Sequence, residues 1–494
     1  MNNILLLGPI FIPLGGAALG VLLARTRTYQ HLIGLVCGVL AWLSSIAILL
    51  ANLNGDVLTY RLGGWQPPYG IVLAADLLTS VFAVMATTVM AAGILYALGC
   101  YDKSVSAPAF MPLFLCMAAG LNGALYTGDM FTLFVFIELM VIASVILVAI
   151  SDNKLGMEAA IKYLFISAMG TLFLLTGIAA LYATFGTLNM ADIGRLLASG
   201  ERPVLAQAAA IMLMCAFLLK SAVFPFHFWQ PDFHTTAPTP VHSVLSSVVV
   251  KVGIYGLIRM TTLMFTAEAQ LIYDLLVILG VIGIFFGSLG ALRTYDAKRL
   301  LAYSTFGQIG FILVGIGWGV PAALAAALVY AVNHSFIKAA LLMITGTISS
   351  RTQTKTSRLT EIVGVGKTLG FTSGLYFVGG LALSGVPPLN GFISKVTLVQ
   401  SGIGVQEWVT LGLVVGAGIL TLLYMTRTWQ LIFQQEADEP VKLKPYGDSH
   451  LAPTLLLAAC VALGLFAAPL IDLAQRAVEQ IGDPTIYIRA VLGG

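Results

Sequence analysis

A lysine and a proline stand close together at the end of a long apolar stretch. The stretch begins near Val204 and ends at Lys220, and Pro225 follows five residues later. Proline removes a backbone donor and clashes with the preceding helical turn, so it predicts a helix break beside the lysine. Within a membrane, such a break and such a charge persist only inside protein or beside a hydrated cavity. We interpret the stretch as a charge held at a hinge in an ion path. The alternative is a lysine that snorkels to the membrane surface.

A carboxylate lies in the middle of another apolar stretch. Glu138 follows Asp129 by nine residues, which is about 13.5 Å at the rise of an α-helix. That spacing places the carboxylate near the centre of a bilayer, where it needs a partner. Lys220 is the natural partner, and a purely structural ion pair is the alternative to a role in transport.

Further basic residues lie within other apolar stretches. His334 can pass a proton because histidine titrates near neutral pH, although a lone buried histidine is often a core residue. Lys338 follows it by one helical turn on the same face, and both a relay role and snorkelling are open for it. Lys395 follows a second hinge at Pro387 and Pro388. The predicted proton-translocation residues are Glu138, Lys220, Lys251, His334, Lys338 and Lys395.

Titratable residues also gather just after the first hinge. They are His227, Asp232, His234 and His242. Histidines with a carboxylate can bind a metal, but a hydrated proton entrance is the interpretation we favour. The sequence therefore predicts no metal and no catalytic residue here.

Composition assigns the chain to a class. The chain has 494 residues, of which 59% are hydrophobic and 10% charged, whereas soluble domains carry roughly 25% charged residues. We therefore predict an all-α polytopic membrane protein in contact with the lipid bilayer. The net charge of +3 and the absence of basic runs argue against nucleic-acid binding. The five cysteines stand singly and support neither a metal site nor a disulfide framework.

Apolar runs of about twenty residues predict about fourteen spans in a single membrane domain, 1–494. A weak internal repeat is visible because each half contains a hinge, and paired interrupted spans are typical of transporter ion sites. The N-terminal stretch Asn3 to Leu23 is predicted to be a retained span. The predicted spans begin near Ile4, His31, Ile71, Pro108, Phe131, Ala159, Val204, Ser243, Leu271, Ala297, Ala322, Leu369, Val409 and Ala452.

Loop charges predict the orientation. With alternating spans, most loop lysines and arginines fall on one side, which the positive-inside rule assigns to the cytoplasm. Both termini then face outward. The outer loop 186–202 is predicted to hold a short amphipathic helix. The residues assigned to the cytoplasm are Arg25, Arg27, Lys103, Lys154, Arg293, Lys298, Arg299, Arg351, Lys355, Arg358, Lys367, Lys442 and Lys444, and those assigned to the outside are Arg61, Arg195, Arg202, Arg476 and Arg489.

Five sequence blocks, in order, resemble the proton-translocating antiporter family. This family comprises antiporter-like subunits of respiratory complex I, related hydrogenases and Mrp-type multisubunit sodium/proton antiporters. The resemblance covers nearly the whole chain. The blocks are Gly128 to Met140, Lys220 to Pro240, Asp296 to Gly310, Asn333 to Lys338 and Leu383 to Lys395.

The resemblance implies a fold and an ion path. It implies fourteen helices, two broken helices and two inverted repeats, which we expect at 108–266 and 271–433. It also implies a hydrophilic axis in the middle of the membrane, with Glu138, Lys220, Lys251, His334 and Lys395 at the family's key positions.

The chain is most similar to the D-type members of Mrp antiporters. The similarity rests on its length, on the hinge 385–392 and on Gly63-Gly64-Trp65. A complex I or hydrogenase homologue is the alternative, although Lys395 departs from the complex I homologue that has glutamate there. The resemblance implies other membrane subunits as partners, H⁺ and Na⁺ as transported ions, and a bacterial plasma membrane. No Rossmann glycine fingerprint or cysteine cluster is present, so we predict no cofactor.

These residues together suggest a mechanism. A proton would enter from the cytoplasmic side near His242 and Lys251 and move through His334 to Lys395. Lys220 would be the switch, charged while paired with Glu138. An ion pair at ~4 Å contributes roughly 4 kcal/mol at an effective dielectric of 20, which is enough to control a proton. A redox-driven pump and a non-transporting scaffold are the competing hypotheses.

Overall fold

The computed structural model describes residues 3–23, 27–200, 203–436 and 441–493. Within these residues the chain is helical apart from one short antiparallel hairpin, β1 (Leu58–Arg61) with β2 (Val72–Ala75). The predicted all-α class is confirmed. Arg25 and Arg202, which contributed to the predicted orientation, lie outside the described residues.

The first part of the chain contains the helices around the first hinge. The helix α7 lies in the loop 186–202, where a short amphipathic helix was predicted. In order, the helices are η1 (Ile4–Leu7), α1 (Gly8–Leu22), α2 (Arg27–Asn52), η2 (Leu62–Gly64), α3 (Leu77–Leu98), η3 (Lys103–Ser106), α4 (Phe110–Tyr126), α5 (Met130–Ala149), α6 (Lys154–Phe185), α7 (Met190–Ala198), α8 (Val204–Lys220), α9 (Gln230–Thr236), α10 (Thr239–Val244), η4 (Leu245–Val249), α11 (Lys251–Arg259) and η5 (Met260–Met264).

The second part contains the helices around the second hinge. They are α12 (Ala269–Arg293), α13 (Ala297–Gly317), α14 (Pro321–Arg351), η6 (Val365–Lys367), α15 (Gly370–Ser384), α16 (Asn390–Val405), α17 (Trp408–Trp429), η7 (Gln430–Gln434), α18 (Leu451–Leu465), α19 (Ala468–Gly482) and α20 (Pro484–Leu492).

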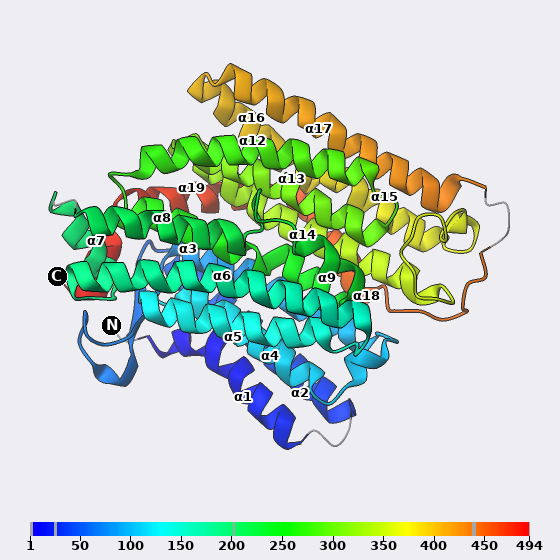
Figure 1. The fold of residues 1–494 in the computed structure, drawn as a ribbon, viewed down its shortest axis with the longest axis horizontal. Helices are drawn as coiled ribbons and strands as arrows, with labels where there is room; N and C mark the ends of the chain where they lie inside the picture. Colours follow the sequence, from blue (N-terminus) through cyan, green and yellow to red (C-terminus); the bar gives the residue numbers. More distant parts are fainter. Residues whose placement is uncertain (1–2, 24–26, 201–202, 437–440, 494) are drawn as a thin grey trace.

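Ten helices of the described residues are long and apolar enough to cross a membrane, or up to eleven if the bent pair α18–α19 is one span. Two shorter apolar helices, α4 and α8, begin where two further spans were predicted. The count of about fourteen and the two inverted repeats stay predictions. Figure 1 places both marked chain ends at the same end of the bundle, as the predicted even number of spans requires.

Side-chain caps explain where several helices begin. Asp76, Asp129 and Asp296 each accept a hydrogen bond from a backbone N–H three residues later, at the starts of α3, α5 and α13. Asn153 and Asn189 do the same for α6 and α7. These short polar side chains satisfy donors that a helix leaves free in its first turn. Asp129 is therefore a cap rather than a second mid-membrane carboxylate.

Both predicted hinges are breaks between helices. α8 ends at Lys220 and α9 begins at Gln230, while α15 ends at Ser384 and α16 begins at Asn390. Gly385 ends α15 in the left-handed region with φ 81°, which glycine adopts without steric penalty. Two helices that each stop at mid-bundle leave carbonyls free at their C-terminal ends.

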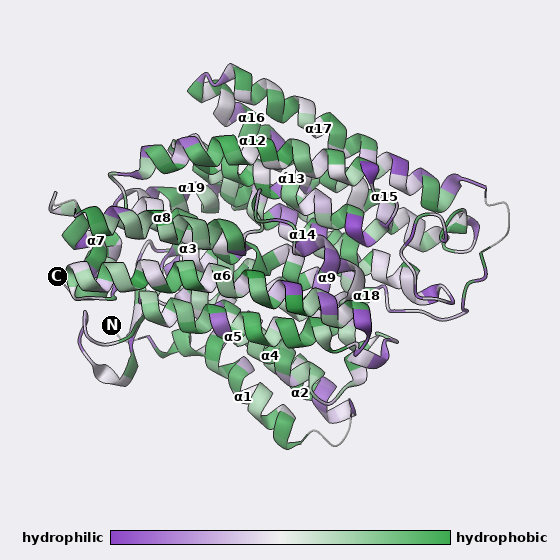
Figure 2. Cartoon of the chain, viewed as in Figure 1, coloured by the Kyte–Doolittle hydropathy of each residue, from purple (hydrophilic) through white to green (hydrophobic). Residues whose placement is uncertain are grey.

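The helices that carry the predicted path form the buried centre. The run Thr239–Met264 and α14 are buried throughout their apolar windows, and α13 nearly so. Only 22% and 33% of the apolar windows of the outer helices α2 and α6 are buried, as expected for a lipid-facing surface. Hydrophilic positions gather around α9 and at the end of the bundle near α18 (Figure 2).

The second hinge depends on a close backbone approach. A methyl group at Gly391 would overlap the carbonyl oxygen of Ala382 on α15. We expect Gly391→Ala to destabilise the protein by about 1–3 kcal/mol, because overpacking shifts the backbone. Thermal unfolding of the purified protein measures the effect. Gly404→Ala, on the same helix with no atom within 4 Å of the added carbon, is the matched control. Equal melting of both variants would contradict the close packing.

Candidate functional site

Three helices meet at the first hinge around one ion pair. The Lys220 Nζ lies 3.7 Å from the Glu138 Oε1. Thr171 of α6 connects them, since its hydroxyl donates to Glu138 Oε1 and lies 3.3 Å from the Lys220 Nζ. The Nζ also donates to the Ser167 carbonyl at 3.3 Å. The predicted pairing of Lys220 with Glu138 is present, and Thr171 is a third member that the sequence did not reveal.

The pair is buried unevenly. The Lys220 side chain is 6% exposed, whereas that of Glu138 is 25% exposed. A methyl group on Gly253 would overlap the Ser221 Oγ and the Phe217 carbonyl, so α11 packs directly on the end of α8. The ammonium is therefore held from within the bundle while the carboxylate stays partly accessible.

Lys251 begins α11 immediately after an irregular helical turn. Residues Leu245–Val249 form a π-helix, a geometry that is rare and frequent at functional sites. The fully buried Lys251 Nζ donates to the Ser246 carbonyl at 3.4 Å. Ser335 connects α14 to the π-helix η4, because its hydroxyl donates to the Ser247 carbonyl at 2.9 Å.

His334 and Lys338 lie on α14 at the centre of the bundle. The Lys338 Nζ donates to the Leu301 carbonyl at 2.9 Å and to the Ser304 Oγ at 2.8 Å, both on α13. This fully buried ammonium does not reach a membrane surface. The His334 ring is buried, and neither ring nitrogen has a hydrogen-bond partner among the described residues. Lys251 and Lys338 both lie close enough to interact with His334 electrostatically.

Lys395 donates a hydrogen bond to a carbonyl at the second hinge. Its Nζ donates to the Ser384 carbonyl at 2.6 Å, and Ser384 is the last residue of α15. The Nζ also lies 5.7 Å from the centre of the Phe311 ring. A helix C-terminus favours a cation because its last carbonyls are unpaired. The hinge therefore supplies the partner of the lysine.

Polar residues missed in the sequence link α14 to the second hinge. The Asn333 amide donates to the Ser394 Oγ at 2.9 Å and to the Asn390 carbonyl at 3.1 Å. These residues are buried; Asn333 directly precedes His334, and Asn390 and Ser394 precede Lys395 in the sequence. Asparagine within an apolar helix is the signal that could have identified them, because its amide needs partners there.

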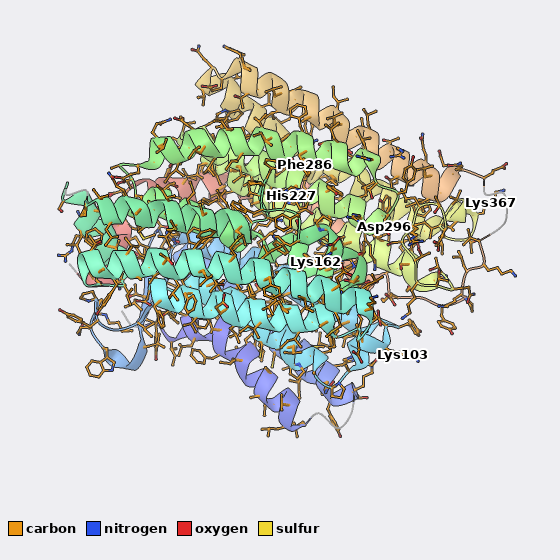
Figure 3. All side chains as sticks on the ribbon, viewed as in Figure 1. Lys103, Lys162, His227, Phe286, Asp296 and Lys367 are labelled. Carbon is orange, nitrogen blue, oxygen red and sulfur yellow. The ribbon has the colours of Figure 1, made fainter. Side chains whose placement is uncertain are left out.

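The four predicted entrance residues do not form one cluster. His234 and His242 are fully buried, with ring centres 5.7 Å apart. His227 instead packs between aromatic rings, with Phe286 at 4.4 Å (Figure 3). Asp232 is partly exposed and pairs with Lys162 at 2.9 Å. No group of three or more His, Cys, Asp or Glu suited to a metal ion occurs among the described residues.

A second buried ion pair lies at the end of the bundle opposite the loop end near α18. The Arg259 Nη2 lies 2.5 Å from the Asp76 Oδ1, and Tyr487 of α20 stacks over the guanidinium at 4.9 Å. Burial raises the pKa of Asp76, but the charge and hydrogen bond of Arg259 outweigh it and hold that pKa below its usual value. This pair joins α3, α11 and α20 and was not predicted.

Comparison with known proteins identifies the family. Residues 127–421 match the model of the NADH:quinone oxidoreductase/Mrp antiporter transmembrane family. The chain belongs to this family. All six predicted proton-translocation residues, from Glu138 to Lys395, lie within the matched region, which includes both hinges.

Relatives within this antiporter family match the chain from end to end. The chain is 32% identical to the D subunit of the Na(+)/H(+) antiporter of Alkalihalophilus pseudofirmus, with 100% of both chains covered. It is 33% identical to the N subunit of the NADH-quinone oxidoreductase of Desulforudis audaxviator, covering 94% of this chain and 96% of the relative. A chain of the Mrp complex from a Dietzia species has a TM-score of 0.91 at 25% identity, with 99% of each chain covered.

Thr171 offers a test of the hinge in this family member. Thr171→Val keeps the shape of the side chain but removes the hydroxyl that bridges Glu138 and Lys220. Hydrogen bonds to charged groups contribute about 1.5–3 kcal/mol, so we expect ion exchange to slow by about tenfold or more. The measurement is ion exchange in vesicles. Thr184→Val, which loses only a bond to its own helix, is the control. Wild-type exchange in Thr171→Val would make the bridge irrelevant to transport.

Proposed function

We propose that this chain is the proton-translocating subunit of a multisubunit cation/H⁺ antiporter in a bacterial plasma membrane. The observation that carries the proposal is Lys220, a buried lysine at a helix break, held by Glu138 and Thr171. Full-length similarity to a protein named as the D subunit of a Na(+)/H(+) antiporter supports a role in a cation/H⁺ antiporter. Similarity to a chain of the Mrp complex supports other membrane subunits as partners.

The proton route continues along the centre of the bundle. Lys251, His334 and Lys338 lie within electrostatic reach of one another. Lys395 stands at the second hinge. Each lysine donates to a carbonyl or a hydroxyl. Such a neutral acceptor can take a hydrogen bond from the neutral amine and also from the ammonium. These sites can therefore hold a lysine before and after it releases a proton.

Lys220 differs because a carboxylate, that of Glu138, lies 3.7 Å from its Nζ beside the neutral acceptors Ser167 and Thr171. When Glu138 is close, its negative charge favours the ammonium; when the two separate, desolvation favours the neutral amine. The Coulomb energy of the pair is roughly 4 kcal/mol at ~4 Å and an effective dielectric of 20. Movement of Glu138 relative to Lys220 is thus sufficient to load and unload a proton.

The orientation follows from the loop charges. The chain ends lie at one end of the bundle, and the loops around 351–369 and 441–450 lie at the other (Figure 1). We assign the loop end to the cytoplasm by the positive-inside rule, with both termini outside. Protons are then taken up at the loop end, and sodium is the cation we assign to the exchange.

The second candidate is a proton-pumping membrane component of complex I or of a membrane-bound hydrogenase. It is favoured by the 33% identity to the N subunit of a NADH-quinone oxidoreductase. The purified complex distinguishes the two, since an antiporter exchanges H⁺ for a cation with no electron donor present. Proton movement that requires a redox substrate would select the second candidate.

The switch role makes Lys220 indispensable. We expect Lys220→Ala to abolish ion exchange in proteoliposomes, because alanine can neither carry a proton nor pair with Glu138. Assembly is checked by native gel electrophoresis. Lys367→Ala, in the loop helix η6, is the control and should exchange normally. Normal proton flux in the assembled Lys220→Ala complex would overturn the proposed function.

Substitutions of Lys395 distinguish a residue that relays protons from one that supplies only a fixed charge. Arginine can donate to the Ser384 carbonyl as lysine does, but it does not deprotonate in proteins. We expect Lys395→Arg to be inactive despite its charge. Lys395→Glu should keep partial activity with a shifted pH optimum, because glutamate titrates. The measurement is ion exchange in vesicles across a pH series. Full activity of Lys395→Arg would mean that the proton leaves by another path.

A further inference from the structure

A large cavity opens at the loop end of the bundle. Its volume is about 800 Å³, and its walls come from η3, the starts of α6, α10 and α13, the ends of α9 and α14, and the loop before α18. Most of the polar atoms in its walls are hydroxyls and lysine ammonium groups. Its acidic residues are Asp102 and Asp448. This cavity is larger than those lined by α16 and α19 or by η5 and α12.

Asp448 is the buried carboxylate of this cavity. It is 3% exposed although it lies in a loop. Its Oδ2 accepts from the Tyr96 hydroxyl at 2.8 Å and its Oδ1 from the Tyr101 N–H at 2.8 Å. The Cys100 thiol lies 3.5 Å from Oδ2. The carboxyl is therefore fixed at the wall by groups from the end of α3.

Asp448 has no ion-pair partner within 4 Å among the described residues. Lys298 of α13 is a buried cation that interacts with it electrostatically. Asp102, the other acid of the cavity, pairs with Lys355 at 3.6 Å. Arg351 of α14 packs against Gly447, the neighbour of Asp448, and Lys444 lies in the same loop as Asp448. Burial raises the pKa of Asp448. The hydrogen bonds from Tyr101 and Tyr96 lower that pKa, but burial has the larger effect.

The wall of the cavity leads to the buried histidine pair. Thr239 lines the cavity, and His242 follows one helical turn later on α10. Thr235 lines it directly after His234. Lys298 lies close enough to both histidines to interact with them, and His234 in turn interacts with Lys338. Lys298 at the cavity wall, the buried histidine pair and Lys338 thus interact electrostatically between the cavity and α14.

We infer that Asp448 collects protons for the ion path, with the cavity as its inlet and His242 and His234 as the next acceptors. The inference rests on the proposed function and adds a residue outside the matched family region. The Asp448 carboxylate takes a proton from a hydronium ion in the cavity and becomes a carboxylic acid. It then releases that proton through cavity water to an imidazole nitrogen and returns to the carboxylate.

The test is Asp448→Asn in the whole complex. Asparagine can still accept from the Tyr101 N–H through its amide oxygen and can donate to the Tyr96 hydroxyl through its amide nitrogen, but it cannot carry a proton. We expect exchange to fall by about tenfold at high pH at the loop end, where protons are scarce, and to approach wild type at low pH. Asp448→Glu should keep the wild-type pH dependence at a reduced rate. Asp102→Asn is the control on the same wall and should exchange normally.

Chemical labelling tests the role of Asp448 in the wild-type protein. Dicyclohexylcarbodiimide reacts with protonated carboxyls, so mass spectrometry of labelled Asp448 across pH reports its accessibility and titration. We expect labelling of Asp448 that increases as pH falls. No labelling at any pH would overturn the inference, as would a loss in Asp448→Asn that is equal at every pH. Normal exchange by Asp448→Asn with an inactive Lys220→Ala would remove only the inlet, whereas an active Lys220→Ala would remove the proposed function itself.

Discussion

The arrangement of this molecule depends on the free energy of holding ammonium groups away from water. A charge in an apolar interior is costly unless it is paired or hydrogen-bonded. Only one lysine of the predicted path, Lys220, has a carboxylate within 4 Å in the described structure. Lys251, Lys338 and Lys395 are held by carbonyls and hydroxyls. Neutral partners stabilise the ammonium less than a carboxylate does.

Irregular helices supply those partners. A regular helix uses its carbonyls internally, so an ammonium in the bundle finds acceptors where the helical pattern is interrupted. Lys395 uses the last carbonyl of α15, and Lys251 uses a carbonyl of the π-helix η4. Lys220 lies in the last turn of α8. The π-helix and the second hinge therefore each provide the acceptor of their lysine, whereas Lys220 takes its acceptors from Ser167 and Thr171 of the unbroken helix α6.

The two ends of α3 differ in a way that suits directional transport. At its first residue, the Asp76–Arg259 pair and Tyr487 close the bundle. At its last turn, Tyr96 holds Asp448 at the edge of an open cavity. The closed end carries a salt bridge that lowers the pKa of Asp76, and the open end carries a carboxyl, Asp448, whose pKa is raised by burial.

The sequence by itself determined the membrane class, the hinges and the main charged residues. Apolar runs reveal spans because lipid offers no hydrogen bonds to the backbone. Prolines beside Lys220 and Lys395 reveal the breaks, and charges in apolar runs stand out because they are so costly there. Even the pairing of Glu138 with Lys220 was predictable, since each needed an opposite charge at similar depth.

Only the tertiary structure decided which neutral groups surround those charges. Thr171, Ser304 and Asn333 are ordinary residues in the sequence and become partners only when helices far apart along the chain pack together. The same packing separates His227 and Asp232 from His234 and His242. The sequence did not predict this separation, because the four residues lie close together along the chain. Asp448 lies in a polar loop, where an aspartate is expected to be exposed, and it is buried because that loop folds back onto the end of α3. Such contacts depend on helix rotation and register, which hydrophobic periodicity fixes weakly in helices that are apolar on all sides.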